Sequence, residues 1–150
     1  MAAIPQETTG AIFERAAHRA REMGLPYAGA VTPAEAHALQ RAAAARIVDV
    51  RTPQEWQHVG HVEEAPLIEW PRGGDGHAVA AFVERIRSEL DPAEPVLFLC
   101  RTGVRSHYAA QVAAQAGFAR AFNVLEGFEG QPGARSGWRG AGLPWKTGER

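Results

Sequence analysis

The most apolar run of the chain, Val96-Leu97-Phe98-Leu99, restricts the possible folds more than any other feature of the 150-residue sequence. The turn-forming pair Asp91-Pro92 precedes it, and a polar segment containing Gly103 follows it. Four apolar residues between such signals are typical of a strand that is buried on both faces. Strands of this kind belong to parallel sheets covered by helices on both sides, so the sequence predicts an α/β fold.

Helical patterns alternate with other short apolar runs along the chain, as a parallel α/β sheet requires. Two capping boxes, Thr32-Pro33-Ala34-Glu35 and Thr52-Pro53-Gln54-Glu55, predict helix starts, and the second helix should end within two turns, near Gly60. The other breaks are a glycine-rich loop over 72–76 and a mostly irregular segment over 126–150. The expected helices are 9–24, 33–44, 78–90 and 106–116, and the expected strands are 47–50, 67–70, 96–99 and 122–125.

The length and the near-neutral net charge of the chain are those of one globular domain without a strong electrostatic field. Hydrophobic residues make up 45% of the chain, and 16 Lys+Arg against 17 Asp+Glu give a formal net charge of -1. We therefore expect neither a nucleic acid nor an anionic membrane as a partner. Residues 1–10 lack the pattern of a signal peptide, and no apolar run is long enough to cross a bilayer, so we expect a cytoplasmic protein.

The chain has one cysteine, Cys100, which excludes an internal disulfide and a cysteine-rich zinc site. His58 and His61 are close to each other in the sequence, but two imidazoles without a neighbouring cysteine are too few to predict a metal site. No glycine-rich nucleotide motif occurs. We therefore expect no metal and no cofactor. If the cysteine has a chemical role, its thiolate acts alone or with a partner from outside the chain.

Cys100 ends the predicted central strand, and a short loop and a helix follow it. Ligands bind at this carboxyl edge of a parallel sheet, where the loop amides and the first turn of the helix have N–H groups free for an anion. A lone cysteine is often only a small buried apolar residue. The guanidinium groups of Arg101 and Arg105 and the flexible Gly103 between them favour a reactive thiolate instead.

Cys-Arg-Thr-Gly-Val-Arg-Ser after an apolar strand resembles the active-site loop of the rhodanese-like domains, sulfurtransferases that carry a persulfide on the loop cysteine. The resemblance implies a single rhodanese-like domain over 31–145, with a mostly parallel central sheet and helices on both faces. Residues 1–30 would be a helical extension and 146–150 a tail. The other matching segments, in order, are Asp49-Val50-Arg51, Glu55-Trp56, Gly60-His61-Val62, Asn123-Val124-Leu125-Glu126-Gly127-Phe128, Gly137-Trp138 and Gly142-Leu143-Pro144.

The resemblance also implies a reaction in two steps. The thiolate of Cys100 would take the outer sulfur of a thiosulfate-like donor, and cyanide, glutathione or a protein thiol would remove it. Arg101 and Arg105 would orient the donor, although Arg105 could instead brace the loop. The implied substrate-binding residues are Arg101, Thr102, Gly103, Val104, Arg105 and Ser106, and the supporting residues are Asp49, Arg51 and His61.

Each supporting residue also has a purely structural interpretation. Asp49 and Arg51 can form an ordinary ion pair at a strand end, and a loop histidine such as His61 is more often structural than catalytic. The sequence departs from the family pattern at Glu63-Glu64-Ala65-Pro66, where a Pro-Gly-Ala type of turn is usual, and in an added loop over 129–137.

Two other functions are compatible with this type of loop. Phosphatases and arsenate reductases on a similar fold have five residues between the cysteine and the arginine, whereas four separate Cys100 from Arg105. The shorter loop favours a single sulfur atom over a phosphoryl group. A non-enzymatic module that docks partners or senses sulfide and redox state is the other alternative, and the presence of the loop cysteine disfavours it.

Overall fold

The computed structural model describes residues 8–71 and 76–148. Most of the loop predicted over 72–76 and the first and last residues of the chain lie outside these ranges, and Gly76 already begins a helix. No helix within the described ranges is long and apolar enough to cross a membrane. The elements are α1 (Thr9–Met23), β1 (Gly29–Val31), α2 (Pro33–Arg41), β2 (Arg46–Asp49), the π-helical segment η1 (Glu55–Val59), α3 (Gly76–Glu89), β3 (Val96–Leu99), α4 (Val104–Gln115), β4 (Ala121–Val124) and α5 (Gly137–Gly140).

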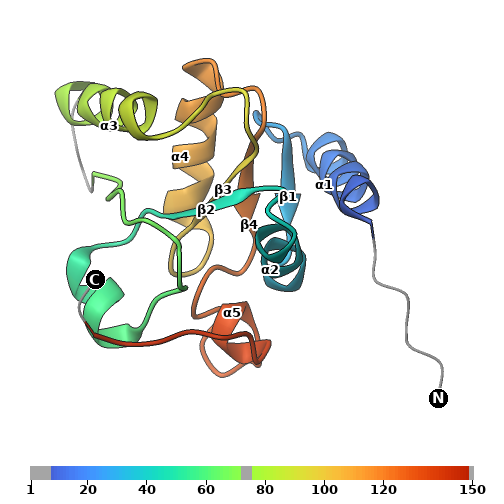
Figure 1. Ribbon diagram of the computed structural model, residues 1–150, viewed down its shortest axis with the longest axis vertical. Helices are drawn as coiled ribbons and strands as arrows, with labels where there is room; N and C mark the ends of the chain where they lie inside the picture. Colours follow the sequence, from blue (N-terminus) through green and yellow to red (C-terminus); the bar gives the residue numbers. More distant parts are fainter. Residues whose placement is uncertain (1–7, 72–75, 149–150) are drawn as a thin grey trace.

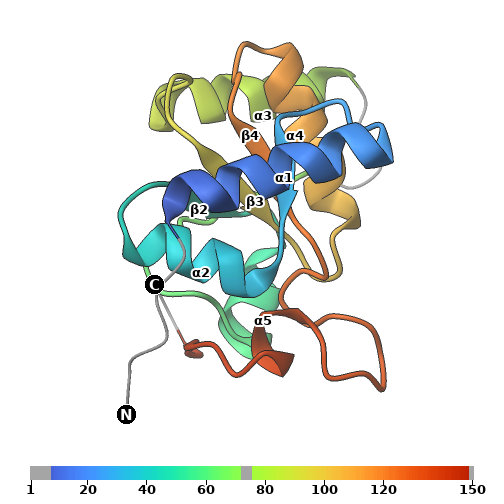
Figure 2. The same cartoon turned by 90° about the vertical axis from the view of Figure 1, so that its right-hand side faces the viewer.

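The four strands form one parallel sheet in the order β1-β4-β3-β2. Helices α1 and α2 cover one face, and α3 and α4 cover the other (Figures 1 and 2). The predicted α/β class, with a parallel sheet between helices, is therefore confirmed. As predicted, β3 is Val96–Leu99, and all four of its residues are buried. The carboxyl ends of β2 and β3 lead directly into Val50 and Cys100, so these two connections leave the sheet at the same edge.

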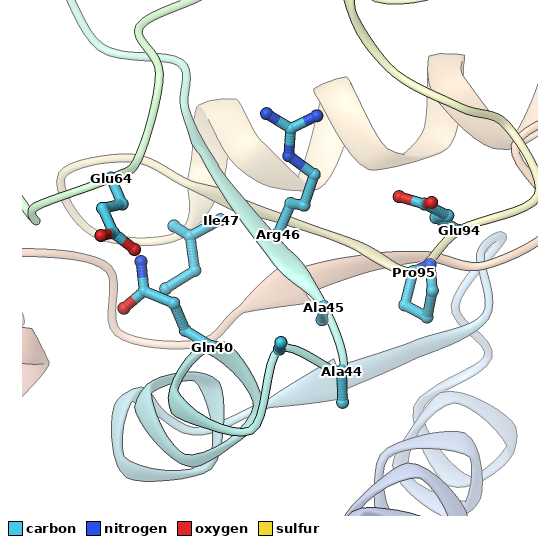
Figure 3. A pocket seen from close by; sticks show the side chains of 9 residues that line it. Gln40, Ala44, Ala45, Arg46, Ile47, Glu64, Glu94 and Pro95 are labelled. Atoms are coloured by element: carbon cyan, nitrogen blue, oxygen red, sulfur yellow. The ribbon is translucent and has the colours of Figure 1, made fainter.

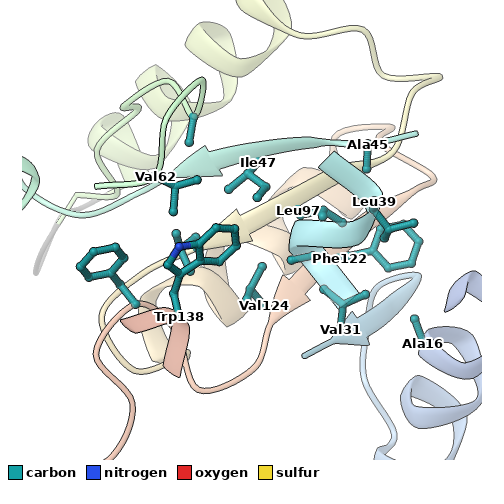
Figure 4. Close-up of a cluster of buried hydrophobic side chains, with 14 of the residues drawn as sticks. Ala16, Val31, Leu39, Ala45, Ile47, Val62, Leu97, Phe122, Val124 and Trp138 are labelled. Atoms are coloured by element: carbon teal, nitrogen blue, oxygen red, sulfur yellow. The ribbon is translucent and has the colours of Figure 1, made fainter. Parts of the chain in front are cut away.

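Apolar side chains fill both spaces between the helices and the sheet. On the α1–α2 side, Trp138 from α5 is fully buried and lies among side chains of the strands (Figure 4). Its indole N–H donates to the carbonyl of Pro144 at 2.8 Å. Trp138 thereby anchors the irregular C-terminal segment to the sheet.

The structure shifts several expected element boundaries, shows one expected strand only as an isolated bridge, and adds one strand. Helix α2 ends at Arg41 instead of residue 44, because Ala43 adopts a left-handed conformation with φ of 54°. Segment 67–70 runs beside the end of β2 but forms only a single bridge, from Leu67 to Asp49. Helix α4 begins at Val104, two residues before the predicted start. The sequence did not predict β1, whose three residues are too few to show a pattern.

The predicted division of the chain at residue 31 stays a prediction, but the preceding segment is part of the packed structure. Strand β1 pairs with β4, and α1 lies so close to β1 that a Cβ atom on Gly29 would be 2.7 Å from backbone atoms of Ala16. Glycine at this position therefore lets the helix approach the strand.

A buried carboxylate joins α1 to α2. The predicted capping box at Thr32 is present, and its Glu35 also accepts from Arg15 at 2.6 Å and from Arg19 at 2.6 and 3.0 Å. Burial by itself would raise the pKa of Glu35, but the hydrogen bonds from Arg19, Thr32 and Arg15 outweigh it and lower the pKa to about 2.

This cluster predicts a pH-dependent stability. Because the pKa of Glu35 in the folded chain lies below its ordinary value of 4.5, its ionised form stabilises the fold above pH 4.5, and this contribution is lost as the pH falls toward 2. Glu35→Gln should therefore lower the free energy of unfolding at pH 6, by at most about 3 kcal/mol. The difference from wild type should shrink at pH 3.

Urea denaturation at both pH values measures this difference. Glu14→Gln changes an exposed carboxylate on α1 and is the matched control, for which we expect a small effect at both pH values. A Glu35→Gln deficit that is equal at pH 6 and pH 3 would contradict the assignment.

Candidate active site

Cys100 lies at the carboxyl end of β3, and its side chain points into a tight loop. The residue is only 1% exposed. Its Sγ accepts a hydrogen bond from the backbone N–H of Gly103 at 3.0 Å. Gly103 has a φ of 102° and is the N-cap of α4, so the chain turns from the loop into the helix within one residue. The sulfur is thus held beside the positive end of a twelve-residue helix.

A side-chain hydroxyl also contacts the sulfur. Ser106, which is fully buried in the first turn of α4, lies 3.2 Å from Cys100 Sγ and 2.5 Å from Asn123 Oδ1. Asn123 lies in β4 and donates from Nδ2 to the carbonyl of Gly103 at 3.2 Å. Through Asn123, the neighbouring strand β4 therefore binds both Ser106 and the loop at Gly103.

The turn after β4 anchors the other side of the loop. Phe128 N donates to the carbonyl of Cys100 at 2.8 Å, and Glu129 N donates to that of Arg101 at 2.9 Å. A Cβ atom on Gly127 would be 2.5 Å from the backbone of Arg101, and its φ is 66°. Only glycine allows this close approach without a shift of the backbone.

Arg105 is bound by a carboxylate that is far away in the sequence. Its two terminal nitrogens donate to the two carboxylate oxygens of Glu55 at 2.8 and 2.9 Å. Burial favours a higher pKa for Glu55, but the bonds from Arg105 and from Thr52 outweigh it and lower the pKa to about 2. The bond to Glu55 is also the main reason why the pKa of Arg105 is raised, with Cys100 and Asp49 adding smaller attractions. This geometry favours the bracing role of Arg105 over donor orientation.

The Arg101 side chain is exposed and lies beside a carboxylate. Its side chain is 55% exposed, and Nε lies 3.1 Å from a carboxylate oxygen of Glu129. Thr102 is partly buried and Val104 is exposed. Of the residues predicted to surround the sulfur, the structure therefore brings Gly103 and Ser106 into direct contact with it, and gives both arginines carboxylate partners.

Asp49 and Arg51 form a fully buried ion pair next to this loop. Arg51 donates from Nη2 to Asp49 at 2.7 Å and to the carbonyl of Gly60 at 2.6 Å. Its guanidinium carbon lies 4.5 Å from the centre of the Phe128 ring. The pair connects the end of β2 to the segment after η1 and to the turn that binds the Cys100 carbonyl, and its supporting role in the reaction stays a prediction.

His61 is buried and its ring contacts a neighbouring aromatic residue. The imidazole stacks on Trp56 with ring centres 3.4 Å apart, and Nδ1 lies 2.8 Å from the Trp56 carbonyl. The backbone of His61 pairs with that of Lys146. These contacts fit the structural interpretation of this histidine. Within the described ranges, no group of three or more potential ligands could hold a metal ion.

The sequence did not predict two residues that shape the site. Glu55 belongs to a capping box and to one of the segments that resemble the family, and neither pattern gives it a role at the loop. Its bonds with Thr52 are present, but the same carboxylate also binds Arg105. Asn123 is a buried polar residue inside an apolar strand. A polar side chain in such a position needs a partner, so Asn123 could have been recognised from the pattern.

A pocket of about 490 Å³ lies at the opposite edge of the sheet. Arg46, Glu94 and Pro95 line it, at the starts of β2 and β3 (Figure 3). It is therefore separated from Cys100 by the length of the strands, and it does not take part in the site.

Comparisons with known proteins agree with this geometry. A family model described as a Rhodanese-like domain matches residues 32–131. The crystal structure of Rv0390 from M. tuberculosis is similar with a TM-score of 0.70 and 40% identity, covering 81% of this chain and 99% of that one.

Two sequence relatives extend the comparison. The protein RP600 of Rickettsia prowazekii is 35% identical over 103 residues, which are 67% of this chain and 81% of that protein. Thiosulfate sulfurtransferase GlpE of Actinobacillus pleuropneumoniae is 38% identical over 63 residues, 42% of this chain and 52% of GlpE. Because the family model matches two thirds of the chain, including strands β2, β3 and β4 and the Cys100 loop, this chain belongs to the rhodanese-like domain family.

Proposed function

We propose that the protein is a sulfurtransferase that moves a sulfane sulfur from a thiosulfate-like donor to a thiophilic acceptor through a persulfide on Cys100. The observation that carries the proposal is the position of Sγ at the N-terminus of α4, where it accepts from Gly103 N at 3.0 Å. Four residues between Cys100 and Arg105 make a loop that suits one sulfur atom. The similarity to GlpE supports the same activity.

In the first step, the Cys100 thiolate attacks the outer sulfur of thiosulfate. A bond forms between the two sulfur atoms, the bond to the sulfonate sulfur breaks, and sulfite leaves with its electron pair. Hydrogen bonds from Gly103 N–H and the Ser106 hydroxyl stabilise negative charge at the cysteine sulfur. The remaining amides of residues 101–106 would bind the outer sulfur.

In the second step, cyanide, glutathione or a protein thiol attacks the outer sulfur and regenerates the thiolate. The acceptor comes from outside, because the chain has no second cysteine. A single unpaired thiol is also compatible with the reducing conditions of the cytoplasm, which we propose as its location.

Mass spectrometry of the intact protein tests the first step. After incubation with thiosulfate, wild type should gain the mass of one sulfur atom and lose it again on addition of cyanide. Cys100→Ser removes the only thiol and should abolish both the mass gain and thiocyanate production. An unchanged circular dichroism spectrum would show that the variant is folded.

The outcomes separate the proposed activity from the alternatives. Turnover by folded Cys100→Ser would overturn the persulfide mechanism. Absence of the sulfur adduct in wild type, together with hydrolysis of a phosphate ester or reduction of arsenate, would favour those activities instead. Absence of all three reactions would favour a non-enzymatic module.

The Arg105–Glu55 pair predicts the outcome of a double-mutant cycle. Arg105→Ala removes the guanidinium that binds both oxygens of the half-buried Glu55 carboxylate, and the negative charge that it no longer balances opposes a dianionic donor. We expect kcat/KM for thiosulfate to fall by roughly tenfold or more. Adding Glu55→Ala removes that negative charge as well and should restore part of the loss.

Steady-state kinetics with cyanide as the acceptor measure all four proteins of the cycle. If the double variant is as impaired as Arg105→Ala, then Arg105 contacts the donor directly and does not act through Glu55. The melting temperature of each variant is measured as the control that the variant is still folded.

A further inference from the structure

A pocket of about 350 Å³ lies beside the Cys100 loop, between α4 and the segment that joins α1 to β1. Exposed apolar side chains line this pocket. Of the four large hydrophobic residues exposed in the described part of the chain, three line it: Met23 at 57%, Val104 at 61% and Tyr108 at 51% exposure. Exposed apolar residues gathered around one cavity are typical of a binding site.

The lining has no carboxylate, ammonium or guanidinium group, and the polar side chains of Tyr27, His107 and Asn123 have partners within the protein. The described residues around the pocket include no Asp, Glu, Lys or Arg. The Tyr27 hydroxyl lies 2.7 Å from His107 Nδ1, and the amide of Asn123 bonds to Ser106 and Gly103. A charged body would lose its hydration here without gaining an oppositely charged carboxylate, lysine or arginine as a partner, so the pocket suits an apolar group.

The pocket and the reactive sulfur share structural elements. Gly103, which donates its N–H to Cys100 Sγ, is also part of the pocket wall, as is Asn123. A molecule seated in the pocket is therefore next to the loop that would carry the persulfide. Met23 and Leu25 form the opposite wall, and they precede residue 32, where the family match begins.

We propose that this pocket binds the apolar body of a small acceptor thiol, an aryl or alkyl thiol. The inference rests on the proposed sulfur transfer. Thiosulfate is a compact dianion and does not suit an uncharged apolar pocket, so the acceptor is the substrate that the pocket selects. The thiolate of the acceptor attacks the outer sulfur of the Cys100 persulfide. A new S–S bond forms, the bond to Cys100 Sγ breaks, and the Cys100 thiolate leaves with the electron pair while the acceptor becomes a persulfide.

The test uses the full chain, first loaded with sulfur from thiosulfate and then freed of excess donor. The rate of sulfur loss is measured by mass spectrometry against three acceptors: benzyl mercaptan, 2-mercaptoethanol and cyanide. The two thiols have similar acidity and differ in the apolar body. Wild type should reach half its maximal rate at a concentration of benzyl mercaptan roughly tenfold lower than that of 2-mercaptoethanol, because only the benzyl group fills the pocket.

A double variant removes the apolar wall without touching the loop. Met23→Gln with Tyr108→Gln should reduce the preference for benzyl mercaptan over 2-mercaptoethanol to roughly threefold or less, because two apolar contacts become polar. The rate with cyanide should stay unchanged. Arg21→Gln with Gln115→Ala changes exposed positions on the same two helices that do not line the pocket, and it should keep the wild-type preference.

Each outcome has a distinct meaning. If wild type does not become loaded with sulfur, the proposed function itself fails. If it is loaded but shows no preference for benzyl mercaptan, the pocket assignment is overturned while sulfur transfer stands. The same holds if the Met23→Gln, Tyr108→Gln variant keeps the full preference.

Discussion

The buried ion pair between Asp49 and Arg51 is the contact on which the geometry of the site depends most. Both side chains are fully buried, and Arg51 also reaches the carbonyl of Gly60 and the ring of Phe128. The end of β2, the segment after η1 and the turn after β4 therefore meet on one guanidinium group. Replacing one member of such a pair typically costs about 3–5 kcal/mol, because the other charge remains buried without a partner. Phe128 N also donates to the carbonyl of Cys100. A displacement of Arg51 would therefore shift the reactive loop through Phe128.

Near the sulfur, carboxylates neutralise the arginines, and backbone and hydroxyl groups contact the sulfur itself. Glu55 holds Arg105 and Glu129 holds Arg101, whereas Gly103 N–H and Ser106 lie at Sγ. Fixed N–H dipoles stabilise charge at a small anion without the reorganisation that flexible side chains require. The loop therefore resembles a preorganised anion site more than a cluster of free positive charges.

Much of this arrangement follows from local sequence, and the remainder depends on contacts between distant segments. The apolar run of β3, the turn at Gly103 and the capping box at Thr32 are local features, and all were predictable. The partnership of Arg105 with Glu55 joins residues 50 positions apart, and no spacing rule links them. Strand β1 exists because β4 provides an edge for it, and its three residues carry no periodic signal. Helix α4 begins two residues earlier than expected, directly after Gly103, because the left-handed conformation of this residue turns the chain into the helix at once.

The hydroxyl of Ser106 has one hydrogen and two acceptors within reach, Cys100 Sγ and Asn123 Oδ1. A thiolate can only accept, so the hydrogen then points to the sulfur and Asn123 loses this donor. A neutral thiol can donate its own hydrogen to Ser106 Oγ, which frees the hydroxyl hydrogen for Asn123. The orientation of one O–H bond thus follows the charge on the sulfur. Through Asn123 and its bond to the Gly103 carbonyl, strand β4 is coupled to the protonation state of a residue on the strand beside it.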